Sequence, residues 1–301
     1  MTPRIAPGLR DLVGAAPAVE PLASGFRFTE GPVWHPVRGD LVFSDIPADE
    51  RWRWTPERGA ERIAHPTRKG NGMTYDAELR LLVCEHSSSC VVRFDGEGRR
   101  EVLASSYEGL ELNSPNDVIV APDGSVLFTD PTFGRNDEFG IQRAVRHELR
   151  GVYRLPPGGG LQLLADDFEE PNGLCLSPDG SRLYVNDSPG AQIRCLDRDT
   201  DGSVSNGVLF ADGIGTGVFG EGIVDGMKCD ALGNVWVTGP GGVWVFDPDG
   251  GHLGVVDVPE EVGNLHWGGP DWSHLYICAS HGLYRLRTGV TGSREPFMGP
   301  A

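Results

Sequence analysis

One pattern recurs along the chain, and it constrains the fold more than any other feature of the sequence. "PNDVIVAPDGSVLFTD" occupies residues 115–130, and "PNGLCLSPDGSRLYVND" occupies residues 171–187. In both, an Asn is followed by an apolar run, a Pro-Asp-Gly-Ser turn and a Leu-aromatic pair. A repeat with a period of about 20–50 residues indicates an architecture built from stacked copies of one supersecondary unit.

Four further copies of this pattern are found, so that the chain contains six. We call the first residue of each copy its opener, and successive openers are 41, 45, 56, 53 and 39 residues apart. An apolar pair follows eleven and twelve residues after the opener, as in Leu82-Val83 and Leu127-Phe128; the first copy carries one extra residue in its turn. The six openers are Glu30, Asn71, Asn116, Asn172, Asp225 and Asn264.

Each unit has the pattern of four short strands separated by turns. The third unit gives "DVIVA", "SVLFTD", "GVYRL" and "LQLLA", with Gly, Asp and Pro at the breaks, where turn geometry favours them. Four strands in a unit of about 40–50 residues are typical of a β-propeller blade. The sequence therefore predicts an all-β fold, a six-bladed β-propeller with four antiparallel strands per blade.

The two ends of the chain predict how the ring closes. The sixth unit supplies "NLHW", "LYICA" and "GLYRLR" but no clear fourth strand, whereas "VEPLASGF" at 19–26 resembles the fourth strand "REVLASSY" at 100–107. We expect the N-terminal strand to complete the last blade, because this pairs edges that would otherwise stay open. The predicted organisation is an N-terminal arm over 1–18 and one propeller domain over 19–301. Only "EFGIQRAVRHELR", at 138–150, has a helix-like pattern.

Composition narrows the classes of partner. The chain has 43 Asp and Glu against 26 Lys and Arg, a formal charge of −17, which makes a nucleic-acid partner unfavourable and suits hard cations. Its six cysteines form no CxxC motif and sit mostly in apolar runs, so we expect buried, reduced thiols. The sequence shows no signal-peptide core and no apolar stretch of membrane-spanning length. We expect a cytoplasmic protein with no membrane partner, or a periplasmic or exported one if a leader has been removed. The oligomeric state is left open.

The openers predict a metal site. Each stands at the start of the innermost strand of its blade, so all six should converge on the central channel. Two carboxylates and four carboxamides are costly to gather without a partner. Water filling the channel is one interpretation, and a cation bound by oxygen ligands alone is the other. Because no opener is His or Cys, the set favours Ca²⁺, with Mg²⁺ or Zn²⁺ as alternatives.

Four motifs in a fixed order carry a resemblance to a known family. "FTEGPVWHP", "LNSPNDVIV", "LYVNDS" and "VDGMKCDALGNVWVTGPGGVWVFDPDG" resemble the SMP-30/gluconolactonase/LRE family of six-bladed propellers, and the match runs from about residue 20 to residue 287. The resemblance implies a divalent metal held by the Glu of E-G-P, the Asn of P-N-G and the Asp of D-G-M. These residues are Glu30, Asn172 and Asp225 here, and Asn116 is implied as a further metal or substrate contact.

The function that this resemblance implies is hydrolysis of a lactone, usually that of a sugar acid. The metal would polarise the lactone carbonyl and lower the pKa of a bound water, and Asp225 would be the catalytic proton acceptor. One alternative keeps the metal and hydrolyses fluorophosphates or phosphotriesters, with Asp225 as nucleophile. Another is a non-catalytic propeller that binds a sugar or a partner protein. Ser114 stands where vertebrate-type members have Arg, which fits the bacterial gluconolactonase pattern better.

Four residues are candidate contacts for a small-molecule lactone. Asn116 and Asn71 are openers, His86 follows Glu85 at the end of a second strand, and His266 lies two residues after the sixth opener. A structural role for either histidine is the competing interpretation. The segment 131–150 is an insertion near the Asn116 turn, and a loop of this length is often a lid.

Overall fold

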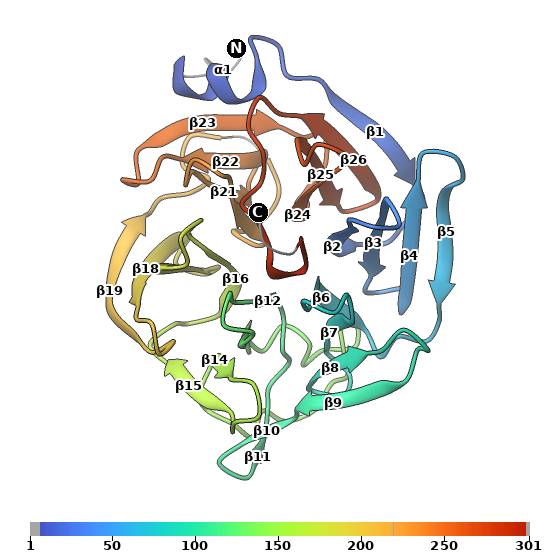
Figure 1. Ribbon diagram of the computed structural model, residues 1–301, viewed down its shortest axis with the longest axis vertical. Coiled ribbons are helices and arrows are strands. Elements are labelled where there is room, and N and C mark those ends of the chain that lie inside the picture. The colour runs from blue at the N-terminus through green and yellow to red at the C-terminus, as the bar shows by residue number, and fades with distance from the viewer. Residues whose placement is uncertain (1–6, 219, 299–301) are drawn as a thin grey trace.

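The computed structural model of the protein describes residues 7–218 and 220–298. Six four-stranded antiparallel sheets stand around a central channel as the blades of a ring (Figure 1). The structure confirms the predicted six-bladed β-propeller. The first six residues of the predicted arm and the last three of the predicted domain lie outside the described residues, and the boundary between arm and domain stays a prediction.

The strands of each blade follow one another from the channel outward. The first two blades contain β2 (Thr29–His35), β3 (Asp40–Asp45), β4 (Glu50–Thr55) and β5 (Gly59–Ala64), then β6 (Gly70–Tyr75), β7 (Leu81–Glu85), β8 (Cys90–Phe94) and β9 (Arg100–Ala104). A small hairpin, β10 (Ser106–Tyr107) and β11 (Leu110–Glu111), leads to the third blade, β12 (Val118–Val120), β13 (Val126–Thr129), β14 (Val152–Leu155) and β15 (Gln162–Ala165).

The second half of the chain repeats this order. The fourth and fifth blades contain β16 (Pro171–Leu176), β17 (Arg182–Asp187), β18 (Gln192–Arg198) and β19 (Val204–Ala211), then β20 (Met227–Cys229), β21 (Val235–Gly239), β22 (Gly242–Phe246) and β23 (His252–Asp257). The sixth contains β24 (Val262–Gly268), β25 (His274–Ala279) and β26 (Gly282–Arg287) from the C-terminal part of the chain.

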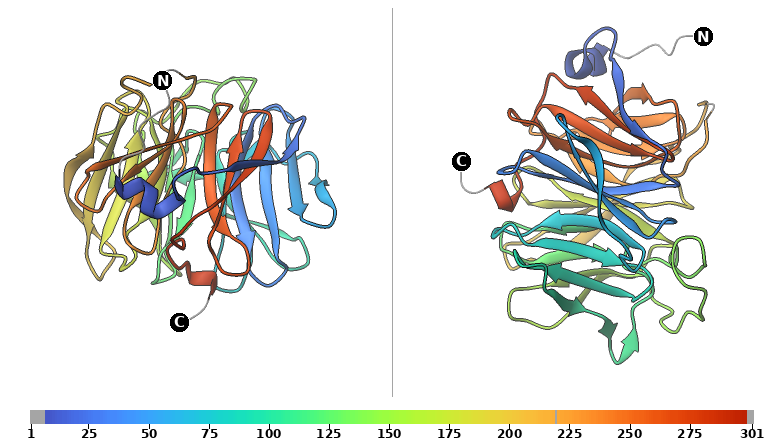
Figure 2. Two further views of the ribbon diagram at one scale, coloured as in Figure 1. Left: turned by 90° about the horizontal axis from the view of Figure 1, so that it is seen from above. Right: turned by 90° about the vertical axis from the view of Figure 1, so that its right-hand side faces the viewer.

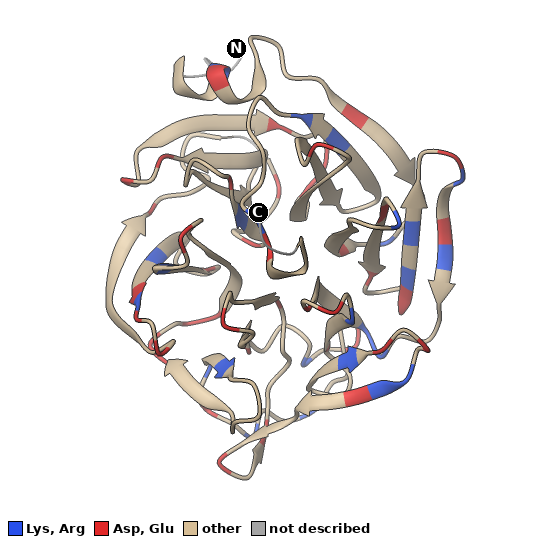
Figure 3. Cartoon of the chain, in the orientation of Figure 1, with Lys and Arg blue, Asp and Glu red and all other residues tan. Residues whose placement is uncertain are grey.

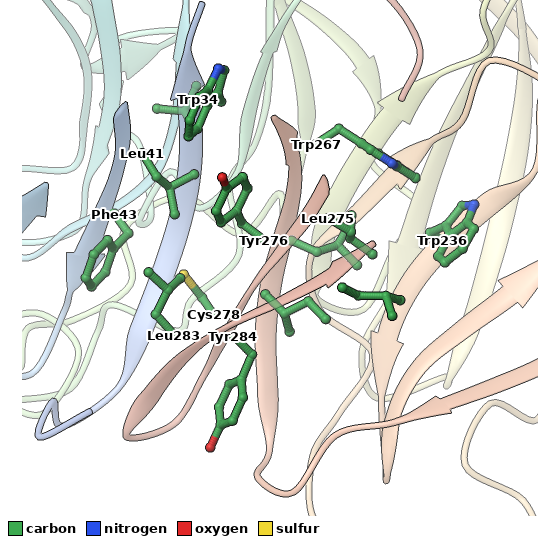
Figure 4. Packing of buried hydrophobic residues seen from close by; sticks show 14 of the residues in the cluster. Trp34, Leu41, Phe43, Trp236, Trp267, Leu275, Tyr276, Cys278, Leu283 and Tyr284 are labelled. Atoms are coloured by element: carbon green, nitrogen blue, oxygen red, sulfur yellow. The ribbon is translucent and has the colours of Figure 1, made fainter. Parts of the chain in front are cut away.

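The N-terminal strand closes the ring as predicted. β1 (Val19–Ser24) forms the outer strand of the sixth blade, in the order β1-β26-β25-β24, with Val19 opposite Leu286 and Ser24 opposite Gly282. Side chains of the first and last blades then pack across the junction (Figure 4). Trp34 of β2 stacks on Tyr276 of β25 with ring centroids 5.2 Å apart. Strand pairing and apolar packing therefore both join the two ends of the chain.

Burial follows the position of a strand in its blade. Every residue of the innermost strands β2, β6 and β24 is buried, because neighbouring blades cover both faces of these strands. Outer strands such as β5 and β19 are largely exposed. Lys and Arg occur on outer strands such as β4, β5, β8 and β9, and Asp and Glu occur around the whole ring (Figure 3). The inner strands are thus the rigid elements that position a site.

The structure corrects two expectations about helices. Residues 138–150 form turns and irregular structure rather than a helix, because their polar groups bond outward: Arg143 reaches Ser89 and Glu111 instead of helical neighbours. The α-helix among the described residues is α1 (Pro7–Val13), whose Leu9, Leu12 and Val13 are buried.

Two further features bear on the expectations from composition. All six cysteines are free and buried, as predicted. Within the described part of the chain, no helix is long and apolar enough to cross a membrane.

A short 3-10 helix, η1 (Pro296–Met298), lies at one face of the disc, close to the channel axis (Figures 1 and 2).

Candidate functional site

A cavity of 580 Å³ opens at the end of the channel where the inner strands begin. Five of the six openers line it: Glu30, Asn71, Asn116, Asn172 and Asp225. Four of these are almost fully buried, with exposed fractions from 1% for Asn172 to 5% for Asn116. The structure therefore brings together the residues predicted as metal ligands, although they come from five different blades.

The sixth opener supports this group from behind. Asn264 does not line the cavity; its Nδ2 atom donates a hydrogen bond to Glu30 Oε2 over 3.0 Å. Glycines that follow the openers allow the close approach of the strands. A Cβ atom on Gly31 would lie 2.1 Å from the carbonyl oxygen of Asn71, and one on Gly173 would lie 2.2 Å from that of Asp225. Only glycine fits where one inner strand passes so close to the next.

The two carboxylates destabilise one another in this buried position. Burial, followed by the negative charge of Asp117, raises the pKa of Glu30 to about 8. Burial and then the charge of Glu30 raise the pKa of Asp225. Acidic groups that share a poorly solvated space resist ionisation together, and a cation between them removes that penalty.

Asn172 presents a free oxygen in the same place. Its Nδ2 atom donates to Ser188 Oγ over 3.0 Å, and Ser188 Oγ in turn donates to the carbonyl oxygen of Val224 over 2.6 Å. The Oδ1 atom of Asn172 is left buried without a hydrogen bond partner. A buried acceptor without a partner is costly, so this atom calls for a ligand.

This donor set fits a hard divalent cation. Two carboxylates balance its charge, and the oxygens of Asn172 and Asn116 supply neutral ligands of the kind that Ca²⁺ and Mg²⁺ take. Among residues 7–218 and 220–298, no group of three or more His, Cys, Asp or Glu side chains could hold a metal ion. Because its donors are two carboxylates and two amide oxygens, the arrangement fits an oxygen-ligand site better than the His and Cys sites typical of Zn²⁺.

The cavity wall includes aromatic and rim residues that sequence reasoning missed. Phe28 and Phe139 meet edge to face with ring centroids 5.5 Å apart. The insertion over 131–150, called the lid below, supplies four lining residues: Phe133, Asn136, Glu138 and Phe139. Its role as a lid stays a prediction. The remaining lining residues are Arg27, Ile46, Glu221, Ile223, Glu261, Ser280 and His281. Several of these precede an opener by two to four positions, and this spacing is the signal that could have identified them.

The structure separates the two histidines predicted to contact substrate. His86 lines the cavity and is 1% exposed; its Nε2 atom lies 3.2 Å from Asn71 Nδ2. His266 does not line the cavity. Because a strand rises about 3.3 Å per residue, His266, two residues beyond Asn264, lies deeper in the channel and away from the cavity. There the Nε2 atom of His266 lies 2.9 Å from the Glu295 carboxylate. We therefore leave His266 out of the proposed substrate site.

Comparison with known proteins gives one consistent result. The family model described as "SMP-30/Gluconolactonase/LRE-like region" matches residues 28–281. The chain is 32% identical to a gluconolactonase of Zymomonas mobilis, over 96% of this chain and 86% of that protein. It is 30% identical to the pentonolactonase XacC of Haloferax volcanii, over 89% of this chain and 94% of that protein.

A solved structure agrees with this result. The solved structure of a Xanthomonas campestris protein described as a gluconolactonase superposes with a TM-score of 0.86 at 33% identity, covering 95% of this chain and 94% of that one. The matched region contains all six openers and the lid. The chain therefore belongs to the SMP-30/gluconolactonase/LRE-like family.

Proposed function

We propose that this protein is a lactonase that hydrolyses the lactone of a sugar acid, with a divalent cation held by Glu30, Asn116, Asn172 and Asp225. The observation that carries this proposal is the gathering of two mutually repelling carboxylates and an unpartnered amide oxygen in one cavity. When bound, the cation, Ca²⁺ in the first place, would polarise the lactone carbonyl and stabilise charge on its oxygen.

The residues that line the cavity have separate roles in the proposed hydrolysis. Asp225 accepts the proton of the attacking water, and its burial beside Glu30 favours the protonated form that this step produces. The aromatic side chains of Phe28 and Phe139 restrict the access of bulk water to the reacting carbonyl. Asn71 lines the cavity and is available to the hydroxyl groups of a sugar acid, whereas both ring nitrogens of His86 are already in contact with Asn71 and with Phe139.

The relatives support the substrate class. Two relatives that the chain resembles over most of its length are a gluconolactonase and a pentonolactonase, whose names denote lactones of sugar acids of different length. A cavity of 580 Å³ with both polar and aromatic walls suits a small polyhydroxylated ring. The same site presents similar demands to a P=O group, so a fluorophosphate serves as the comparison substrate.

The test measures acid release from glucono-1,5-lactone, with the spontaneous rate subtracted, in three states of one preparation. The states are the protein as purified, after chelation with EDTA, and after restoration of Ca²⁺. We expect activity to fall to the background rate on chelation and to return with Ca²⁺. Activity that survives complete metal removal contradicts the proposal, as does a higher rate on a fluorophosphate than on any sugar-acid lactone. Absence of turnover in every state on a panel of sugar-acid lactones favours a non-catalytic propeller.

A further inference from the structure

A chain of hydrogen bonds runs from the lid to the cavity through a buried histidine. The Nδ1 atom of His86 lies 2.8 Å from the carbonyl oxygen of Phe139, in the lid. Its Nε2 atom lies 3.2 Å from the Nδ2 atom of Asn71. The Oδ1 atom of Asn71 is buried and has no hydrogen bond partner, although Asn71 lines the cavity.

We propose that His86 is a positioning residue: held in the Nδ1–H tautomer by the lid, it fixes the amide of Asn71 so that Oδ1 accepts a hydrogen bond from a hydroxyl of the substrate. This inference rests on the proposed lactonase function and adds a specificity device to it.

The first step of the argument concerns the tautomer. A backbone carbonyl only accepts hydrogen bonds, so the short contact with Phe139 requires a hydrogen on Nδ1 of His86. Burial lowers the pKa of His86 to about 4, so the ring is neutral under assay conditions and carries a single N–H. Its Nε2 atom is therefore an acceptor.

The second step concerns the amide. An acceptor at Nε2 attracts the NH₂ group of Asn71 and repels its oxygen, so only one of the two amide orientations is stable. That orientation leaves Oδ1 as the free polar atom of a residue in the cavity wall. A hydroxyl donor satisfies this atom. Sugar-acid lactones carry such donors, and an unsubstituted lactone of the same ring size does not.

The third step concerns the lid, which holds the carbonyl of Phe139 in place. Ser114 donates to the carbonyl oxygen of Pro131 over 2.6 Å and accepts from the backbone N–H of Gly134 over 2.9 Å. A Cβ atom on Gly134 would lie 2.7 Å from both His86 and Ser114, so the lid backbone packs directly against the histidine. Lid, histidine and amide thus form one unit.

The kinetic test compares D-glucono-1,5-lactone with δ-valerolactone, which has the same ring without hydroxyl groups. The readout is the ratio of kcat/KM for the first substrate to that for the second in His86→Phe, Asn71→Leu and the double variant. We expect a wild-type ratio well above 1, which falls by about tenfold in each single variant. The double variant should be no lower than Asn71→Leu, because His86 acts through Asn71. The kcat/KM for δ-valerolactone should stay within about threefold.

A control separates this effect from the loss of any histidine. His252→Phe changes a residue of the outer strand β23, outside the cavity, and should leave the ratio unchanged. A wild-type ratio near 1, or losses from His86→Phe and Asn71→Leu that multiply in the double variant, would overturn the inference. So would an equal fall in kcat/KM for both lactones, which indicates a merely structural role.

A second measurement tests the tautomer without any need for turnover. In protein labelled with ¹⁵N-histidine, the ring signals missing from the His86→Phe spectrum belong to His86, one of eight histidines in the chain. We expect a neutral ring with the hydrogen on Nδ1; a hydrogen on Nε2, or a charged ring at pH 6, contradicts the inference. If the wild-type protein hydrolyses no lactone of the sugar-acid panel, the proposed function fails, and the spectrum still decides the tautomer of His86.

Discussion

The two ends of the central channel are built by the same inner strands but treat polar groups in opposite ways. At the mouth, which is the end where the cavity of the candidate site opens, the amide oxygens of Asn71 and Asn172 have no hydrogen bond partner. At the far end, His266 pairs with Glu295 over 2.9 Å, and the ring of Phe297 stacks against the histidine. The cavity beside that pair measures 70 Å³, against 580 Å³ at the mouth.

The strand β24 contributes to both ends, with Asn264 behind the mouth and His266 deeper in the channel. What distinguishes the two ends is therefore whether the chain itself places an oppositely charged partner beside the buried polar group, rather than polarity or depth. At the far end the chain supplies its own partner, the C-terminal segment that contains Glu295. At the mouth the chain places no such partner beside the amide oxygens, so a bound ligand has to provide one.

The largest effect should come from Asp225→Asn at the mouth. This change removes the proposed proton acceptor and one negative ligand, so we expect kcat to fall by about 10²–10⁴-fold. The midpoint of thermal unfolding without Ca²⁺ should not decrease, because the change removes a carboxyl group whose ionisation is opposed by burial and by Glu30. Background-subtracted kinetics and thermal denaturation of the same sample check both parts. Full activity in this variant would contradict the assignment of Asp225.

The second prediction compares the two ends by their response to Ca²⁺. A ligand present at about 100 times its Kd adds roughly 2.7 kcal/mol to stability, which for a chain of this size raises the unfolding midpoint by about 5 °C. We expect this shift in the wild type and its near loss in Asn172→Leu, which removes the free Oδ1 atom. Glu295→Gln, at the far end, should keep the full shift and is the matched control. An equal shift in all three proteins places the cation elsewhere.

The smallest effect on function should come from Glu295→Gln itself. Burial alone raises the pKa of Glu295, but the charge and hydrogen bond of His266 outweigh it and leave the pKa below its usual value of 4.5. The ionised carboxylate therefore stabilises the fold above pH 4.5, and this contribution is lost as the pH falls through the lower folded-state pKa.

We expect Glu295→Gln to lower the free energy of unfolding by about 1–2 kcal/mol at pH 7 and by progressively less under acidic conditions. Urea unfolding at pH 7 and at pH 3.5 measures the difference. The kcat/KM should remain within about twofold of the wild type, because Glu295 does not line the 580 Å³ cavity at the mouth. A large loss of activity with unchanged stability would show that the two ends are coupled.

The sequence was sufficient for the fold because each blade carries its own turns and apolar pairs in a fixed register. It was also sufficient to predict the convergence of Glu30, Asn172 and Asp225, because the start of every inner strand meets at one end of the channel. Depth along the strand was harder to predict. His266 follows its opener by only two residues, yet it pairs with Glu295, whose position depends on how the C-terminal segment returns to the ring.

The other differences between the predicted and the observed structure also arise from contacts between residues that are distant in sequence. The segment 138–150 has helical spacing, but its Arg143 bonds to Ser89 of the second blade and to Glu111 of the β10–β11 hairpin instead. Phe28 and Glu261 reach the cavity from two and three residues before their openers, outside the stretch from which the repeat was recognised. The partners of these side chains are distant in sequence, so tertiary contacts rather than local pattern decide where they lie.

The pairing of Val19 with Leu286 also determines when the molecule can be finished during its synthesis. A ribosome adds about 5–20 residues per second, so β1 emerges on the order of tens of seconds before its partner β26 exists. Throughout that time five blades can assemble in order, while the outermost strand of the sixth must wait as an unpaired edge. The sixth blade is thus completed by strands made early and late in synthesis, and the ring around the cavity is closed only after β26 has been made.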